Sequence, residues 1–478
     1  MSSALRVLLF ASITASTPLA SAQLVYDISD DGHEIAFPDL IAPESSMPRG
    51  VQVPYGNEPD QVIMLRRQVG GIQVADMNND GLDDVVVGCY ISTSNPPYTD
   101  WRDMIFYNIG NGQIESTPSW ISTNQDHTGD VQVGDINNDG YLDLVTIHGG
   151  SLTPASVRAY LGTPTGPHQT ADYVSNTPVP GWGTSGLLLD IDHDGDLDLV
   201  TTNQGQGASD PYRPIYIWLN SAGMFIDVPY WQSTEQSIQS GLAAGDYDGD
   251  GWEDIAVAKW NGWRSAIYKN NHSVVNQTPV WTEPDTDTDK GAVFADFDGN
   301  GWPDVAFGGD PATMYANNAG ASFSLMWTSM APAQGPQDFR AVDVDNDGDP
   351  DLAEIHFSTG RIYIYLNQDG VVDNFPTWGY DAPEVGTALA FGDLNGDQYP
   401  DMVAGFSGDT CLRIFLAMDL GCPVDIAEPF GQLDFSDVVG FLIAFGQQDP
   451  AADLAQPFGQ IDFSDIVAFL VQFDAGCP

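Results

Sequence analysis

The sequence predicts an all-β protein in which seven small sheets form a β-propeller, followed by a small two-helix domain. Three observations lead to this prediction. An acidic nine-residue motif recurs seven times at intervals of 47 to 59 residues, apolar stretches flank its copies, and the composition changes after Met418. One propeller blade contains four strands in roughly 40–50 residues, which matches the repeat length.

The composition limits the classes of function. The chain has 478 residues, with 67 acidic and 14 basic side chains and a formal net charge of −53. Because phosphate contacts need Lys and Arg, this charge argues against binding to nucleic acid and to an anionic membrane surface. Hydrophobic residues make up 42% of the chain, which is enough for a core. Most acidic residues are Asp, which favours turns and metal loops over helices.

The N-terminus has the pattern of a secretory signal peptide over residues 1–22. Arg6 precedes an apolar run from Val7 to Ile13, and Ala20-Ser21-Ala22 precedes Gln23. No later apolar run approaches the roughly 20 residues that a transmembrane helix needs. We therefore expect a secreted or cell-surface protein, with the propeller over residues 23–418.

The repeated motif reads D-x-[DN]-x-[DN]-[GQ]-x-x-D. Its copies occupy residues 76–84, 135–143, 190–198, 246–254, 296–304, 343–351 and 393–401. Strand-like stretches flank the copies, for example Ile72–Ala75 before the first and Val85–Val87 after it. Each motif is therefore predicted to be the turn of a β-hairpin.

Two further elements complete a predicted blade. Most repeats carry a third apolar strand that ends near Asn, as at Asn108, Asn220 and Asn367. The fourth element often contains Pro and then Trp, as at Trp120, Trp231, Trp281 and Trp378. Because these tryptophans occur once per blade and in register, they favour packing between blades over sugar stacking.

A ring needs a strand from the start of the chain to complete its last blade, and Val62–Val69 is the candidate. The stretch Gln23–Asp60 is about the size of a blade but lacks the motif, so an eighth, degenerate blade stays open. An even number of cysteines in an exported chain favours disulfides, and four cysteines allow three pairings. The organisation of the chain favours Cys422–Cys477 and, across the seam of the ring, Cys89–Cys411.

Oxygen ligands at alternating positions are what calcium prefers in a short loop. Positions 1, 3, 5 and 9 of the motif offer side-chain oxygens, position 7 offers a backbone carbonyl, and Gly at position 6 permits the reversal. The alternative is a set of Asx-turns with no ion. The pattern predicts about seven structural calcium ions, held by Asp76, Asn78, Asp80, Leu82, Asp84, Asp135, Asn137, Asp139, Tyr141, Asp143, Asp190, Asp192, Asp194, Asp196, Asp198, Asp246, Asp248, Asp250, Trp252, Asp254, Asp296, Asp298, Asn300, Trp302, Asp304, Asp343, Asp345, Asp347, Asp349, Asp351, Asp393, Asn395, Asp397, Tyr399 and Asp401.

These repeats resemble FG-GAP/VCBS repeats, the calcium-bearing blades also found in the propellers of integrin α-subunits. The resemblance covers roughly residues 70–418. It implies a seven-bladed propeller with calcium loops at one rim and a role in adhesion or ligand binding. It does not imply a particular ligand.

Residues 419–478 contain a duplicated segment that starts at Asp425 and again at Asp453. Each copy is predicted to be a polar loop followed by an amphipathic helix, and two such helices could pack face to face. The apolar stripes comprise Val438, Val439, Leu442 and Phe445, and Ile466, Val467, Leu470 and Phe473.

This duplicated segment, with its terminal Gly476-Cys477-Pro478, resembles a dockerin-type domain. The resemblance implies attachment to a cohesin-like or surface partner. Ala427 and Pro429 stand where calcium ligands are expected in the first copy, and Ala455 and Pro457 in the second, so too few oxygen ligands remain for calcium.

The sequence favours a non-catalytic protein that binds a glycan or a protein ligand. It contains no H-E-x-x-H and no G-x-S-x-G motif. A polysaccharide lyase or glycoside hydrolase built on the propeller is the alternative. For an anionic polysaccharide, several arginines should converge on one face; the candidates are Arg66, Arg67, Arg102, Arg158, Arg213, Arg264, Arg340 and Arg361.

Overall fold

A computed structural model describes most of the residues from 53 to 418 and a short part of the C-terminal segment. The described residues are 53–90, 100–125, 127–149, 157–175, 182–204, 213–286, 288–332, 335–418, 435–447, 466 and 469. The chain divides into units of residues 1–48 and 49–478. The predicted signal peptide, most of Gln23–Asp60, Cys422 and Cys477 lie outside the described residues.

Five sheets have four antiparallel strands each. They comprise β6 (Thr128–Gly134), β7 (Asp143–His148), β8 (Val157–Tyr160) and β9 (Tyr173–Val174); β10 (Trp182–Leu189), β11 (Asp198–Gln204), β12 (Tyr216–Trp218) and β13 (Trp231–Gln232); β14 (Gln239–Gly245), β15 (Asp254–Lys259), β16 (Ala266–Tyr268) and β17 (Trp281–Thr282); β18 (Gly291–Ala295), β19 (Asp304–Gly308), β20 (Thr313–Asn317) and β21 (Phe323–Thr328); and β22 (Pro336–Val342), β23 (Asp351–His356), β24 (Arg361–Tyr365) and β27 (Trp378–Asp381). A small hairpin of β25 (Asn367–Gln368) and β26 (Val371–Val372) precedes β27. In each sheet the strands follow chain order, as expected for blades.

An eight-stranded sheet joins the beginning of the propeller to its end. Its strands are β1 (Gln61–Ile63), β2 (Arg67–Ala75), β3 (Asp84–Cys89), β4 (Met104–Phe106), β5 (Trp120–Ile121), β28 (Val385–Gly392), β29 (Asp401–Gly408) and β30 (Leu412–Phe415). β1 pairs with β30, with Val62 opposite Arg413, and β2 pairs with β29. The predicted closing strand is therefore present, but it is shorter than Val62–Val69, because the residues from Arg67 onward belong to β2.

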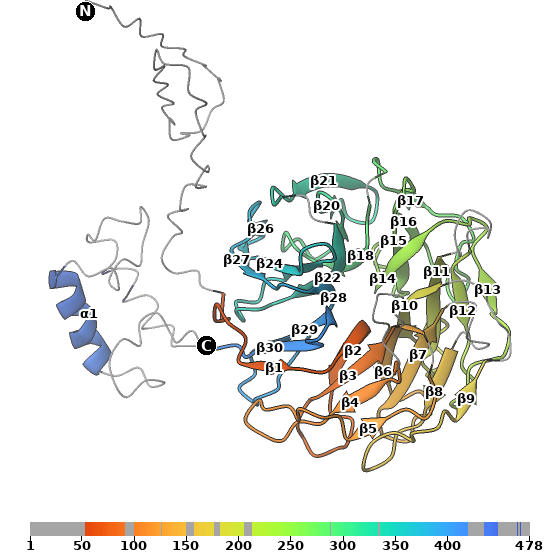
Figure 1. The fold of residues 1–478 in the computed structure, drawn as a ribbon. Helices are drawn as coiled ribbons and strands as arrows, with labels where there is room; N and C mark the ends of the chain where they lie inside the picture. Colours follow the sequence, from red (N-terminus) through yellow and green to blue (C-terminus); the bar gives the residue numbers. More distant parts are fainter. Residues whose placement is uncertain are drawn as a thin grey trace, which may run out of the picture. The chain divides into compact units, whose positions relative to one another are not determined.

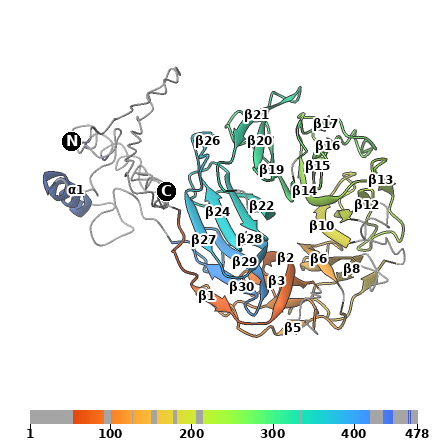
Figure 2. The same cartoon turned by 45° about the horizontal axis from the view of Figure 1, so that its top comes forward.

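The first strands of the sheets form a ring. β2, β6, β10, β14, β18, β22 and β28 each contact the next, and β28 contacts β2. The red strands from the start of the propeller and the blue strands from its end lie side by side in Figure 1 and Figure 2. A Cβ atom on Gly129 would lie 1.9 Å from the carbonyl oxygen of Gly183, so glycine is required where β6 approaches β10.

Tryptophans of the fourth strands link neighbouring sheets. The indole Nε1 of Trp120 donates to the carbonyl of Pro167 at 2.7 Å, and that of Trp231 donates to Val275 at 2.8 Å. Trp120 and Trp231 are both buried. The predicted packing between blades is confirmed for these two side chains, because buried rings are not available to stack on a sugar.

The closing strand provides a test of ring stability. Ile63 is fully buried and packs in the cluster that joins the two ends of the propeller. We expect Ile63→Ala to lower the free energy of unfolding by about 2–5 kcal/mol, because it leaves a cavity at the seam. The matched control is Val62→Ala on the same strand, where the side chain is 41% exposed. Equal effects of the two substitutions in denaturant unfolding would contradict the seam packing.

The predicted Cys89–Cys411 disulfide is not formed in the structure, where both residues are free thiols. They lie buried in one apolar cluster, together with Val87 and Leu412. Burial raises the pKa of both thiols, that of Cys411 to about 12. A neutral thiol packs as a small apolar group, so the two cysteines can fill this apolar cluster without forming a disulfide bond.

The C-terminal segment contains helix α1 (Phe435–Gln447), and Ile466 and Phe469 are also helical. Phe441 is buried and stacks on Phe469 with ring centroids 4.2 Å apart. The predicted stripe is partly wrong, because Val439 and Leu442 are exposed. The buried face is centred on Phe441, whose ring offers more apolar area and lies one turn from Phe445.

We found no helix among the described residues that has the length and apolar character needed to cross a membrane.

Candidate metal centre

All seven acidic motifs form the hairpin between the first and second strands of a sheet. The loop at 76–84 joins β2 to β3, with Ala75 opposite Asp84, and the loop at 393–401 joins β28 to β29, with Gly392 opposite Asp401. The other five loops have the same register. The predicted hairpin turns are confirmed. Because the same hairpin carries the motif in every sheet, the loops lie at the same end of the strands.

Each loop is wrapped around the carboxylate of position 1. In the loop at 343–351, Asp343 Oδ1 accepts from the amide of Asp347 at 3.1 Å, and Oδ2 accepts from Gly348 at 2.9 Å. Asp347 Oδ1 accepts from the amide of Asp349 at 2.9 Å. The bond that Asp347 accepts is that of an Asx-turn, and the three bonds together orient the carboxylates of positions 1 and 5 within the loop.

Two positions in every loop have left-handed backbone. At position 6 the residue is Gly in six loops and Gln398 in the seventh, where φ is 72°. Position 4 also has a positive φ, and its residues are Asn79, Asn138, His193, Gly249, Gly299, Asn346 and Gly396. Asn and Gly tolerate this conformation best, so their recurrence at position 4 was a sequence signal for it.

The backbone at position 6 gives a reciprocal test. We expect Gln398→Gly to raise the free energy of unfolding by about 0.5–1 kcal/mol, because glycine adopts positive φ without strain. Gly348→Gln should lower it by about 1 kcal/mol, since no atom lies within 4 Å of a Cβ there and the cost is purely conformational. Denaturant unfolding measures both, and a loss of stability in Gln398→Gly would contradict the assignment.

Carboxylates converge in four of the loops. In each set, one oxygen from every member lies within 4.8 Å of the others; the sets are Asp190, Asp192 and Asp194; Asp246, Asp248 and Asp250; Asp296, Asp298 and Asp304; and Asp343, Asp345 and Asp347. The remaining three loops have Asn at position 3. In two of them this amide donates to the carboxylate of position 5, from Asn137 to Asp139 at 3.1 Å and from Asn395 to Asp397 at 2.8 Å.

The loop at 343–351 fits a divalent cation well. Asp345 Oδ1 is buried and has no hydrogen-bond partner among the described residues. Burial and the neighbouring charges of Asp347 and Asp343 raise the pKa of Asp345 to about 6. A bound cation would give this oxygen a partner and remove the repulsion, which is how calcium uses such oxygen sets.

The Asp at position 9 has a role that the sequence did not indicate. Asp351 is fully buried, and its two oxygens accept from the amides of Val344 at 2.9 Å and Asn367 at 2.6 Å. Burial raises its pKa to about 8. The side chain ties the loop to the end of the third strand. Two backbone amides hold the corresponding oxygens of Asp84, Asp143, Asp254, Asp304 and Asp401 in the same way.

The Asn that follows or ends the third strand links adjacent loops. Asn367 Nδ2 donates to the carbonyl of Phe297, which is position 2 of the preceding loop, at 2.9 Å. Asn108 donates to Leu394 at 2.7 Å and so links the first sheet to the last. The recurring Asn was visible in the sequence, but its partner lies in another repeat. The same link is made by Asn220, Asn270 and Asn317.

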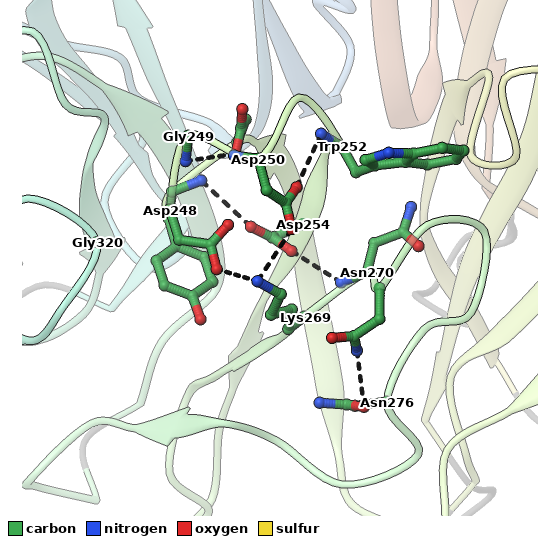
Figure 3. Close-up of polar contacts among 12 residues, drawn as sticks. Asp248, Gly249, Asp250, Trp252, Asp254, Lys269, Asn270, Asn276 and Gly320 are labelled. Atoms are coloured by element: carbon green, nitrogen blue, oxygen red, sulfur yellow. Dashed lines mark hydrogen bonds and ion pairs between the residues drawn. The ribbon is translucent and has the colours of Figure 1, made fainter.

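The loop at 246–254 differs from its neighbours because a lysine enters it. Lys269 follows β16, and its Nζ contacts Asp248 Oδ2 and lies 3.0 Å from Asp250 Oδ2 (Figure 3). Burial lowers the pKa of Lys269, but the bonds to these two carboxylates raise it further, so the net shift is upward. The ammonium of Lys269 thus occupies the carboxylates that are open to a cation in the loop at 343–351.

Five of the eight candidate arginines form ion pairs with Asp. Arg66 pairs with Asp409 at 3.3 Å, and Arg340 pairs with Asp338 at 2.9 Å. Carboxylates also pair with Arg67, Arg102 and Arg361. Because their charges are compensated, these five side chains are not arranged to attract an anionic polysaccharide.

A hollow of about 200 Å³ opens near the loop at 190–198. Apolar groups make up most of its lining, which comprises Ile191, Ile217, Tyr230, Trp231, Ser273, Val274 and Val275. The described residues that line it include no pair of carboxylic acids of the kind that glycoside hydrolysis uses.

Comparison with known proteins supports the repeat assignment. The family described as FG-GAP-like repeat matches residues 76–146, 190–257, 246–307, 296–354 and 343–404, which together cover more than half of the chain. All seven loops lie within these segments. A search of curated proteins found no match.

Solved structures show the same fold. A crystal structure of BBS1N in complex with ARL6DN, soaked with lead, has a chain that is 16% identical with a TM-score of 0.52. The mercury-soaked form gives 14% identity and a TM-score of 0.53. Each match covers 77% of this chain and 99% of the other. With five repeat matches and a propeller fold, the chain belongs to the FG-GAP-like repeat family.

Proposed function

We propose that this protein is a secreted or cell-surface propeller that calcium stabilises and that binds a glycan or protein ligand without catalysis. The observation that carries the proposal is the set of acidic hairpin loops at one end of the strands, with carboxylates converging in several of them. Oxygen-rich loops of this kind serve a structural ion, which leaves the rest of the propeller surface for recognition.

The proposed propeller has seven blades. The ring of first strands and the eight-stranded sheet support this number, because that sheet contains two sets of four strands joined through β2 and β29. In this arrangement β1 is the fourth strand of the last blade. The eighth blade considered for Gln23–Asp60 has no strand in its described part, residues 53–60.

Calcium would be held by the side chains of positions 1, 3 and 5 and by the carbonyl of position 7. In the loop at 343–351 these are Asp343, Asp345, Asp347 and the carbonyl of Asp349. Asp351 would mainly support the loop and not coordinate the ion, since the backbone amides of Val344 and Asn367 already donate to its two oxygens. A bound ion would fix the hairpin that starts each sheet.

Two observations favour binding over catalysis. The candidate arginines that form ion pairs are compensated by Asp, and the hollow beside Trp231 is apolar. The similar BBS1N structures are complexes with a protein, ARL6DN. A protein ligand is therefore in keeping with this fold.

The ends of the chain would supply export and attachment. Residues 1–22 have the signal-peptide pattern, and residues 419–478 would form a dockerin-like module for a cohesin-like or surface partner. The stacking of Phe441 on Phe469 supports contact between the two copies of its loop–helix unit.

The decisive experiment screens the purified exported protein against polysaccharide and extracellular-protein panels. Both retention and product release are measured, with calcium and after chelation. We expect calcium-dependent retention without product. Release of oligosaccharides that scales with protein concentration would establish the enzyme alternative. Binding that survives after chelation has unfolded the propeller would place the ligand site outside it.

A further inference from the structure

The loop at 246–254 has the same frame as its neighbours. Asp246 Oδ1 accepts from the amide of Asp250 at 3.1 Å, and Oδ2 accepts from Gly251 at 2.7 Å. Asp250 Oδ1 accepts from Trp252 at 3.1 Å. Its three carboxylates lie within 4.8 Å of one another, as in the loops at 190–198 and 343–351. The hairpin itself is therefore shaped like a cation site.

The side chain at position 3 makes different contacts in this loop from those it makes in the loops at 190–198 and 296–304. In the loops at 190–198 and 296–304, the Oδ1 atoms of Asp192 and Asp298 accept from the amide of position 5 at 3.2 and 3.1 Å. In the fourth loop Asp248 Oδ2 instead contacts Lys269, and its Oδ1 has no partner among the described residues. Figure 3 shows the side chain of Lys269 pointing toward Asp248 in the loop.

The ammonium is positioned between two of the predicted ligands, Asp248 and Asp250, and its Nζ contacts both. The side chain of Lys269 is 21% exposed, that of Asp248 is 18% exposed and that of Asp250 is 23% exposed. Such limited exposure strengthens the attraction between the charges relative to a pair in open solvent. A calcium ion bound to the same two carboxylates would be repelled by the ammonium.

The lysine is particular to this repeat. Lys269 immediately precedes the linking Asn270, and the residue before the equivalent Asn220 is Leu219. The residues before Asn108, Asn317 and Asn367 are also uncharged: Tyr107, Ala316 and Leu366. A positive charge at this place is therefore a departure from the other repeats and not a general feature of the blades.

The next sheet holds this loop from the other side. A Cβ atom on Gly320 would lie 2.9 Å from the Cα of Asp248, and Asn317 Nδ2 donates to the carbonyl of Tyr247 at 2.7 Å. The position-3 residue thus has the neighbouring turn packed against its backbone, while Lys269 compensates its carboxylate. Neither contact requires a metal.

We infer that the loop at 246–254 is closed by the ammonium of Lys269 in place of calcium. The inference rests on the proposal that the other loops bind calcium. The fourth hairpin then keeps its conformation when calcium is scarce, while its neighbours depend on the ion. The ligand set remains beneath the lysine, so removing the charge should restore a cation site.

The test is a reciprocal exchange read out by the number of bound calcium ions, measured by native mass spectrometry on the intact folded protein. Lys269→Leu should bind one ion more than the wild type, and Leu219→Lys should bind one ion fewer. Lys290→Met is the charge control, because Lys290 lies over the ring of Trp260 away from the loops, and it should leave the number unchanged.

Asp250→Asn locates the exchanged ion. It should leave the wild-type number unchanged and remove the ion gained by Lys269→Leu. A loss of one ion when Asp250→Asn is made in the wild type would overturn the inference, as would an unchanged number in Lys269→Leu. A wild type that binds no calcium would instead refute the proposed calcium role.

Leu219→Lys keeps the test decisive if Lys269→Leu does not fold. A folded Leu219→Lys protein that retains its full number of ions shows that a lysine at this place does not exclude calcium, which overturns the inference. Loss of a single ion supports it. Terbium provides a second readout: Trp252→Phe should reduce the sensitised emission by a larger amount in the Lys269→Leu background than in the wild type, where Trp252 stacks on His193 of the loop at 190–198 and can sensitise only an ion bound there.

Discussion

Chelation of calcium is expected to lower the melting temperature of the protein by about 20 °C. At a free calcium concentration 100 times the dissociation constant, one site stabilises the folded state by about 2.7 kcal/mol. Six independent sites would contribute on the order of 15 kcal/mol. A propeller of this length has an unfolding entropy that converts this free energy to a shift of roughly 20 °C. The structural reason is that uncompensated carboxylates, such as the buried Asp345 oxygen, repel one another without the ion.

The measurement is a thermal melt followed by circular dichroism in excess chelator and again after calcium is restored. Magnesium at the same ionic strength is the control, because it requires stricter octahedral geometry and should restore less of the shift. An unchanged melting temperature in excess chelator would leave the loops as metal-free Asx-turns.

Asp351→Ala is expected to lower the free energy of unfolding by about 3–5 kcal/mol, because it leaves two buried amides without acceptors. These amides belong to Val344 in the loop and to Asn367, which follows the third strand β24. The side chain of Asn367 also donates to the carbonyl of Phe297 in the preceding loop, so displacing Asn367 would weaken the contact between two neighbouring sheets as well. Denaturant unfolding in the presence of calcium gives the effect.

Two variants separate this effect from a general loss of charge. Asp349→Ala removes a carboxylate from the same loop, but its side chain is only half-buried, and the change should stay within about 0.5 kcal/mol. Asp351→Asn keeps one acceptor oxygen and should fall between the two. If Asp349→Ala and Asp351→Ala destabilise equally, the tie between loop and third strand is not what position 9 supplies.

The hairpins and their order were predictable because their determinants are local. A nine-residue motif contains both the side chains that bond its own amides and the residues that adopt positive φ, as at Asp343 and Gly348. The closing strand was harder to delimit. β1 has only three residues, so its apolar pattern cannot be separated by sequence alone from that of β2, which starts at Arg67.

Features that join residues far apart in the sequence were not predictable. The lysine at 269 is separated by 21 residues from Asp248, and its side chain meets the loop only after β16 has paired with β15. The carbonyl partner of Asn108 lies 286 residues away at Leu394. In the C-terminal segment the predicted apolar stripe passed through Val439 and Leu442, which are exposed, and only the contact between Phe441 and Phe469 identified the buried face.

The pairing of β1 with β30 has a consequence for biosynthesis. The strand that completes the final sheet is made first, and its partner Leu412 is made about 350 residues later. Until the ribosome has passed that point, Gln61–Ile63 has no edge to join and the nascent ring stays open. Shortening the propeller from either end therefore removes one of the two strands, β1 or β30, whose pairing closes the ring. Cutting a turn between two central sheets would leave this pairing intact.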